Sequence, residues 1–325
     1  MGFKSFLIRK VIRSFAVFFV VVTLIFIIPR LLPGGAFAYL IENPNIPVET
    51  RERLIHIFGL DRPLPEQYVK FLKELFLKGN LGISFRYLTP VTEVIMNALP
   101  WTLLLVGSST LLSSTLGIIF GAVAAFYREK KTDNIIVNIL MAIRSIPSFW
   151  LGMVLLLILG FQLGLFPLYG AYTYGVKETF WVRISDILHH LALPLLSLTI
   201  IQLAGYTMIM RAPTIDVLGE DFIVTARAKG LSRKRVLFKH AVRPAMLPVV
   251  TILAISIGSI IGGALITETV FSYPGTGKLL YEAINMTDYP LMLGIFFYIT
   301  VLTLVMMFIT EILYAYLDPR IRSEW

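Results

Sequence analysis

Six stretches of 16 or more residues contain no Asp, Glu, Lys or Arg, and this pattern limits the fold more than any other feature. They cover residues 14–29, 94–127, 145–176, 187–210, 244–267 and 289–310. A helix needs about 20 mostly apolar residues to cross the hydrocarbon core of a bilayer. Pro100, Pro147 and Pro167 interrupt the two longest stretches, so each is expected to hold one helix and an apolar loop or interfacial segment. The sequence therefore predicts an all-α integral membrane protein with six transmembrane helices.

The charged residues are distributed unevenly around these six spans. Only 15% of the residues are charged and the net charge is +9, whereas a typical soluble protein has about 25% charged residues. If the spans alternate in direction, one side carries 18 basic and 8 acidic residues, and the other carries 11 basic and 12 acidic residues. Cytoplasmic loops are the basic ones, so both termini are expected in the cytoplasm. The positive charge then reflects topology, and a nucleic-acid partner is not expected.

The spans divide the chain into three regions. Residues 1–30 are expected to form a cytoplasmic N-terminus and the first span, 31–98 an external helical segment, and 99–325 a five-helix core. In the external segment, Pro47 and Gly59 bound one predicted helix, and Asp61 and Gly79 bound a second. The second helix is amphipathic, so one face must lie on an apolar surface. This segment is either a structural cap on the spans or a docking surface for an external partner.

The cytoplasmic segment formed by residues 211–247 is the longest and most basic. Glu220 and Asp221 favour the start of a short helix, Gly230 favours its end, and Ser232 is expected to cap a second short helix. Such a loop could simply hold the topology and contact anionic lipid. Alternatively, two ordered cationic helices could bind a cytoplasmic partner. The physical properties of these residues favour the two interpretations equally.

The fifth stretch has a small, weakly polar face. Ser256, Ser259, Gly263 and Thr267 follow the spacing i, i+3, i+7 and i+11, which puts them on one side of a continuous helix. This stretch and two others contain GxxxG pairs, which let helices approach closely. The face is therefore interpreted either as a helix-packing surface or as the lining of a translocation path for a solute.

Sequence signals for catalysis and for metal binding are missing. There is no HExxH or GxSxG motif, no His cluster at metal-ligand spacing and no Cys. Residues 275–278 (GTGK) resemble a phosphate-binding loop, but Ser272 and Leu279 occupy positions where that loop needs Gly and Ser or Thr. We therefore expect a chain that is not an enzyme and holds no metal or cofactor. If it takes part in active transport, another subunit must supply the energy.

The basic loop also carries residues that resemble a known family. Residues 225–232 (TARAKGLS) and 240–248 (HAVRPAMLP) are similar to the cytoplasmic EAA loop of ABC-importer permeases. Further similar motifs lie at residues 6–10, 30–34, 59–68, 79–85, 146–152, 268–275, 288–290 and 318–322. Together they resemble the dipeptide/oligopeptide/nickel permease family, and the large external segment resembles its first, B-type, subunit. One departure is that Val224, Thr225 and Ala226 stand at the EAA positions, so the Glu and the first Ala are absent.

This resemblance implies a permease subunit of an ATP-driven ABC importer in the cell (inner or plasma) membrane. The residues implied for ATPase coupling are Phe222, Thr225, Ala226, Arg227, Lys229, Gly230, Ser232, Arg233 and Lys234. Implied partners are a second homologous permease, two cytoplasmic ATPase subunits that bind ATP and Mg, an external solute-binding protein and membrane lipid. Peptides or similar small solutes are the expected cargo, ahead of oligosaccharides or nickel. The alternatives are a scaffold or receptor subunit that passes no solute, and a standalone channel.

Overall fold

The computed structural model describes residues 3–31, 47–58, 61–175 and 179–317, and within these ranges the fold is helical without β-strands. The helices are α1 (Phe3–Leu31), α3 (Val48–Phe58), α4 (Leu64–Lys78), α5 (Val91–Phe126), α6 (Lys131–Arg144), α7 (Ser148–Leu155), η1 (Leu156–Gln162), α8 (Phe180–Leu218), α9 (Asp221–Ala228), α10 (Arg233–Arg235), η2 (Val236–Ala241), α11 (Val242–Ala245), α12 (Leu247–Ser259), η3 (Ile260–Gly262), α13 (Leu265–Val270), α14 (Thr276–Asn285) and α15 (Tyr289–Leu317). Segments η1 and η2 are π-helical, and η3 is a 3₁₀ turn.

Four of these helices, α1, α5, α8 and α15, are long and apolar enough to cross a membrane. Two bent helix pairs meet the same criterion when each is taken as one span, so the described residues hold between four and six spans. One pair joins α6 to α7 and η1 with a bend of 95°, and the other joins α10–α11 to α12 with a bend of 56°. Membrane-crossing helices are thus confirmed, and the exact number of six spans stays a prediction. The third apolar stretch holds α7 and η1 followed by a loop, as expected, whereas the fifth holds α12, η3 and α13 instead of one continuous helix.

Proline chemistry accounts for these interruptions. Pro147 directly precedes α7. It has no N–H to donate and disfavours helical backbone at Ile146, so α6 cannot continue through it. At the second bend, Pro248 takes an early position in α12, where a missing N–H costs nothing. A stretch without charges can therefore contain a sharp bend that its hydropathy does not indicate.

The contact between α5 and α8 lies at the centre of the fold. A Cβ added at Gly117 would overlap Tyr206, and one at Gly121 would lie 2.6 Å from the carbonyl oxygen of Thr207. These glycines let the two backbones approach closely, as small residues do in membrane helix pairs. The close-packing interpretation of this GxxxG pair is confirmed.

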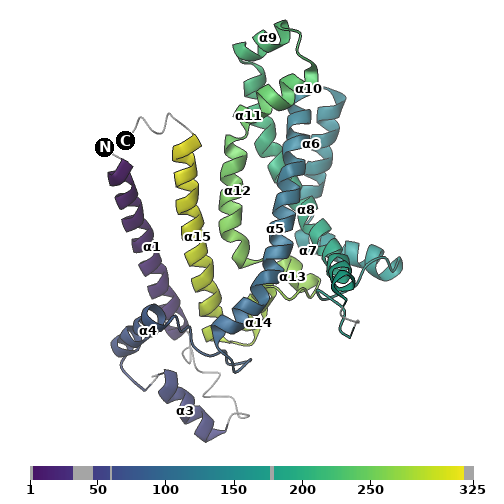
Figure 1. The fold of residues 1–325 in the computed structure, drawn as a ribbon. Helices are drawn as coiled ribbons and strands as arrows, with labels where there is room; N and C mark the ends of the chain where they lie inside the picture. Colours follow the sequence, from purple (N-terminus) through teal and green to yellow (C-terminus); the bar gives the residue numbers. More distant parts are fainter. Residues whose placement is uncertain (1–2, 32–46, 59–60, 176–178, 318–325) are drawn as a thin grey trace.

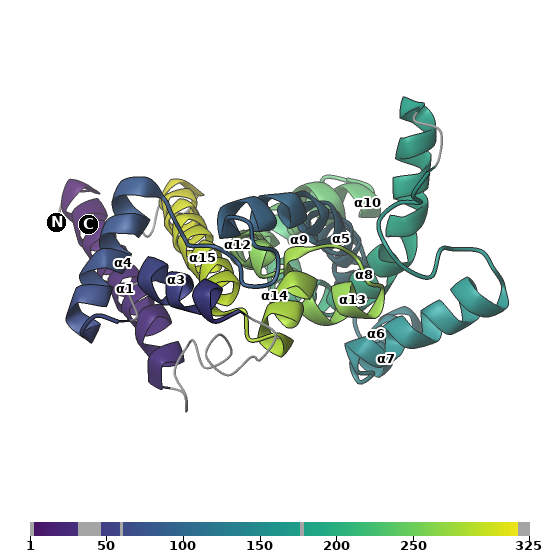
Figure 2. The same ribbon diagram turned by 90° about the horizontal axis from the view of Figure 1, so that it is seen from below.

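The two ends of the molecule carry different elements. Figure 1 shows the start of α1 and the end of α15 at the same end as α9 and α10, with α3, α4 and α14 at the opposite end. In Figure 2, α1 and α4 lie at one side of the molecule, and α6 and α7 lie at the other. The described chain therefore starts and finishes on one side of the bundle. The identity of that side as cytoplasmic stays a prediction from the charge pattern.

The amphipathic helix predicted in the external segment is α4, and its apolar face lies on α1. The rings of Tyr68 and Phe71 have centroids 5.0 and 5.4 Å from that of Phe26. Tyr68 Oη and Thr23 Oγ1 share a hydrogen bond of 2.6 Å. Gly79 ends the helix in a left-handed conformation, as predicted. For α4, these contacts support the structural-cap interpretation.

Candidate functional site

The basic loop between α8 and α12 is folded onto the ends of two long helices. Ile223 and Ala226 lie three residues apart on α9, and both are buried. They join Val236 of η2 and Tyr206 and Met210 of α8 in one apolar cluster. Residues at this spacing share a helix face, so α9 turns one face inward and the other toward solvent. The loop is therefore an ordered element attached to the long helices.

The predicted helix–Gly–helix arrangement of this loop is confirmed. Gly230 follows α9 with φ 73°, a left-handed conformation that glycine adopts without strain. The N–H of Leu231 donates to the carbonyl of Ala226 at 3.4 Å. Ser232 stands before α10 as predicted, but its side chain makes no capping bond. Its carbonyl instead accepts the N–H of Val236 at 3.0 Å, which starts the next helical turn.

Eight of the nine residues assigned to ATPase coupling are exposed on this loop. They are Phe222, Thr225, Arg227, Lys229, Gly230, Ser232, Arg233 and Lys234. Ala226 is the exception, because it is 6% exposed and belongs to the apolar cluster beneath α9. The methyl group of Ala226 therefore supports α9 from within, and its role in ATPase coupling stays a prediction.

Two exposed apolar residues of the same surface were not singled out from the sequence. Val224 is 59% exposed and Phe238 is 45% exposed, close to the 47% of Phe222. Exposed apolar side chains rimmed by charged ones are typical of a protein interface. In the sequence, the bulky apolar residues that stand among the basic residues of 222–239 could have indicated that these two side chains belong to the exposed surface of the loop.

A buried ion pair links α6 to the part of α8 from which the loop departs. Arg211 donates from Nε to Asp133 Oδ1 at 2.8 Å and from Nη2 to Asp133 Oδ2 at 2.6 Å. Asp133 is 2% exposed and also accepts the N–H of Glu129 at 3.1 Å. We call the pair Asp133–Arg211 the α6–α8 clamp. Sequence reasoning missed it because the partners are 78 residues apart and Arg211 is one of many basic residues nearby.

The four residues predicted to share one face do not lie on one continuous helix. Helix α12 ends at Ser259, and after η3 the chain turns at Gly263 with φ 68°. A Cβ on Gly263 would lie 2.5 Å from the backbone nitrogen of Gly277, so only glycine fits there. Thr267 follows this turn on α13 and is 5% exposed. The common face is therefore wrong, because Gly262 and Gly263 interrupt the helical period that it required.

Ser256 contacts α8, one of the two helices at the centre of the fold. Its Oγ accepts a hydrogen bond of 3.1 Å from Tyr206 Oη, which joins α12 to α8. The side chain of Ser259 lies outside the described residues. A role for Ser256, Ser259, Gly263 and Thr267 in a solute path stays a prediction.

The Gly-Thr-Gly-Lys segment binds a carboxylate of the chain itself. Glu268 is 0% exposed. Its oxygens accept hydrogen bonds from Thr102 Oγ1 at 3.0 Å, from the N–H of Ala264 at 3.2 Å and from the N–H of Lys278 at 3.0 Å. A Cβ on Gly275 would overlap this carboxylate. Burial raises the pKa of Glu268. The glycines thus make room for an internal carboxylate at the start of α14.

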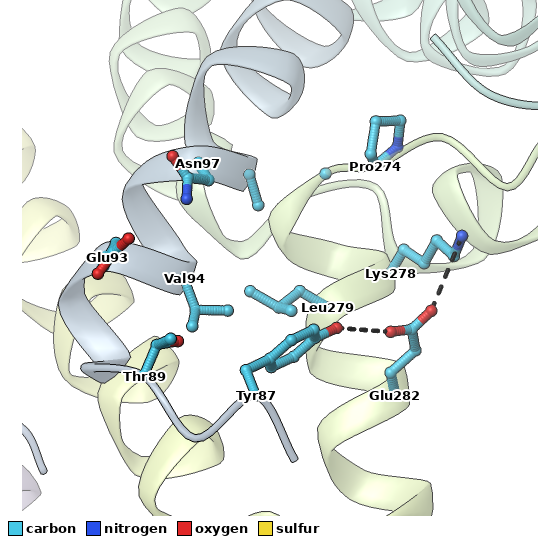
Figure 3. A pocket seen from close by; sticks show the side chains of 11 residues that line it. Tyr87, Thr89, Glu93, Val94, Asn97, Pro274, Lys278, Leu279 and Glu282 are labelled. Carbon is cyan, nitrogen blue, oxygen red and sulfur yellow. Dashed lines mark hydrogen bonds and ion pairs between the residues drawn. The ribbon is translucent and has the colours of Figure 1, made fainter. Parts of the chain in front are cut away.

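An open pocket of about 470 Å³ lies beside this carboxylate, between α14 and the start of α5. Figure 3 shows Tyr87 and Glu282 pointing toward each other, with Glu93 and Asn97 on α5. Tyr87 Oη donates to Glu282 Oε2 at 3.1 Å, and Lys278 Nζ lies 3.7 Å from Glu282 Oε1. The pocket offers carboxylates and an ammonium group, so it suits a zwitterionic solute or a protein loop of mixed charge.

Comparison with known proteins identifies the family. Residues 117–323 match the family described as binding-protein-dependent transport system inner membrane component, and residues 3–106 match the N-terminal family of such membrane components. The chain belongs to this permease family. The similarity to dipeptide and oligopeptide permeases seen in the sequence is confirmed.

Several relatives of this permease align over almost its whole length. The oligopeptide transport system permease protein AppB of Bacillus subtilis is 39% identical over 318 residues. The di/tripeptide transport system permease protein DppB of Pseudomonas aeruginosa is 34% identical over 334 residues, and the dipeptide transport system permease protein DppB of Escherichia coli is 31% identical over 337 residues. Each alignment covers 98% of this chain and 99% of the relative.

Among the residues that the structure describes, no group of three or more His, Asp or Glu side chains could hold a metal ion.

Proposed function

We propose that this permease forms one half of the solute path in an ATP-driven importer of peptides. The observation that carries the proposal is the ordered loop of α9, α10, η2 and α11. Its inner face is anchored on α8, and its outer face exposes basic and apolar side chains. Relatives that align almost end to end are named as oligopeptide, di/tripeptide and dipeptide permeases. A membrane subunit driven by another protein needs such a surface to receive movement.

In this proposal the loop is the contact with a cytoplasmic ATPase subunit. The eight exposed coupling residues named above make the contact, and Ala226 supports it from within. ATP and Mg bind to the two ATPase subunits, so this chain is not itself an enzyme. When the ATPases close, α9 is displaced, and the apolar cluster and the α6–α8 clamp carry that displacement to α8 and α6. Packed elements transmit such movements because they shift between discrete arrangements instead of deforming gradually.

The path itself requires two permeases in this proposal. A second homologous permease supplies the other half, and both termini of this chain lie in the cytoplasm with the basic loop. Ser256, Ser259, Gly263 and Thr267 contribute small, weakly polar groups along the way. An external solute-binding protein delivers the peptide at the end where α14 and the pocket of Figure 3 are found. Peptides are preferred to oligosaccharides and nickel because the relatives compared above are named as peptide permeases.

Reconstitution of the complete transporter tests this function. The permease is purified with its second permease, both ATPase subunits and the binding protein, and is placed in vesicles with a labelled dipeptide. We expect uptake that requires ATP, and ATP hydrolysis that is stimulated by the loaded binding protein. A scaffold subunit would bind the ATPases without uptake, and a channel would pass the peptide without ATP. Either of these results would refute the proposal.

A further inference from the structure

Gln202 is a polar residue inside the membrane-crossing part of α8. It belongs to the charge-free stretch 187–210 and stands eight residues before the end of that stretch. At 1.5 Å per residue, the nearer end is about 12 Å away, so Gln202 lies well within a hydrocarbon layer about 30 Å thick. An amide at this depth costs free energy unless its polar groups find hydrogen-bond partners.

One end of this amide is bonded to α5, and the other end is free. Ser113 Oγ donates to Gln202 Oε1 at 2.9 Å, a shorter contact than the 3.2 Å from the same hydroxyl to the carbonyl of Thr110. Within the described residues, Gln202 Nε2 has no hydrogen-bond partner, and it is not one of the buried polar atoms that lack a partner. The two N–H groups of this nitrogen are therefore accessible at the surface of α8.

Further hydroxyl groups accompany Gln202 along α8. Thr199 and Tyr206 lie three residues before it and four residues after it, so all three share one side of the helix. Thr199 is 4% exposed, and its hydroxyl has no partner in the described part of the chain. Tyr206 Oη donates to Ser256 Oγ of α12 at 3.1 Å. A Cβ added to Gly205 would meet no atom within 4 Å, so there is open space close to Gln202.

The helices that carry these polar groups stand in the middle of the molecule. In Figure 2, α12 and α5 lie between α1 on one side and α6 and α7 on the other, and α8 lies beside α5. Two permeases that meet along this middle part would enclose the side chains exposed there. Lipid chains cannot accept the free N–H groups of Gln202, whereas every peptide bond offers a carbonyl oxygen that can.

We propose that Gln202 contacts the peptide in the solute path, where its free N–H groups donate to the carbonyl oxygen of a peptide bond. This inference rests on the proposed function, because it takes the path between two permeases as given. Ser113 is a positioning residue for this contact, since its bond to Oε1 turns the nitrogen of the amide outward. The path is then lined by α8 at this depth, in addition to Ser256 of α12.

Uptake of two matched peptides by the reconstituted transporter tests this contact. The probes are labelled dialanine and its thioamide analogue, in which sulfur replaces the oxygen of the peptide bond and accepts hydrogen bonds more weakly. The binding protein is the same in every sample, so a change in the ratio of the two uptake rates comes from the permease. Gln202→Met keeps the length of the side chain without its N–H groups, and it should reduce the preference for dialanine at least threefold. Ile201→Met, at the neighbouring position on α8, should leave the preference unchanged.

A second variant and an assembly assay separate this contact from other roles. Ser113→Ala removes the bond that orients the amide and keeps Gln202, so it should reduce the preference by a smaller factor; an unchanged preference overturns the positioning role. Equal preferences in Gln202→Met and Ile201→Met overturn the peptide contact. If Gln202→Met no longer co-purifies with the second permease, Gln202 binds that subunit, and the inference is also overturned. Absence of ATP-dependent uptake in the wild type would instead refute the proposed function itself.

Discussion

Replacing Asp133 by Asn should destabilise this permease far more than changing the exposed carboxylate of Glu129, which lies just before α6. Both oxygens of Asp133 accept hydrogen bonds from the guanidinium of Arg211, and one oxygen also accepts the N–H of Glu129. Asn has nearly the same shape but only one oxygen and no charge. One bond of the pair is then lost, and Arg211 keeps its charge beside a neutral group.

The size of this effect follows from burial. Removing one partner of a buried ion pair costs about 3–5 kcal/mol, because the remaining charge stays away from water. The side chain of Arg211 is 26% exposed, so water reaches part of it and we expect the lower end, about 3 kcal/mol. Glu129→Gln is the matched control, because the Glu129 side chain is 81% exposed and its loss should cost less than about 0.5 kcal/mol.

Thermal unfolding in detergent measures the difference. A loss of about 3 kcal/mol corresponds to a decrease of roughly 5 °C in a chain of this size. The double variant Asp133→Asn with Arg211→Gln should recover part of the loss, because no buried charge then lacks a partner. In the reconstituted transporter, peptide-stimulated ATP hydrolysis should decrease more than basal hydrolysis. Equal melting temperatures for Asp133→Asn and Glu129→Gln would refute the argument that the clamp is a desolvated ion pair.

Three further predictions test the loop, the helix contact and the internal carboxylate. Replacing Arg227, Lys229 and Arg233 together by Glu should change the melting temperature by less than about 2 °C, because the three side chains are exposed. The same variant should lower ATP-dependent uptake at least tenfold. Normal uptake would contradict the ATPase contact. Gly121→Ala should destabilise the protein by about 1–3 kcal/mol through a clash with Thr207. Gly107→Ala on the same helix meets nothing within 4 Å and should be neutral or stabilising, so thermal unfolding should rank the two variants in that order. Burial raises the pKa of Glu268, so the folded protein binds this proton more tightly than the unfolded chain. The difference in stability between the wild type and Glu268→Gln should therefore favour the wild type most below about pH 4.3, and this advantage should decrease as the pH rises through the raised pKa of Glu268. A difference in melting temperature between the two proteins that does not change with pH would contradict this.

Sequence patterns predicted correctly the features that depend on residues close together in the chain. The apolar positions of α4 recur with the helical period, and Gly79 ends that helix in the expected left-handed conformation. Gly230 ends α9 for the same reason, and the exposed basic residues around it follow from their charge. By contrast, the common face of Ser256 and Thr267 was wrong because spacing arguments assume an unbroken helix, and the turn at Gly263 breaks it.

By itself, the sequence determined that the chain crosses a membrane several times, which loop is basic and ordered, and which family it resembles. These properties depend on hydropathy, charge and short motifs, and each can be read from residues close together in the chain. Only the tertiary structure decided that Asp133 meets Arg211, that Glu268 lies beneath the Gly-Thr-Gly-Lys segment, and that Gln202 meets Ser113. Each of these depends on helices that are distant in sequence, and their contact is set by packing, which no local pattern encodes.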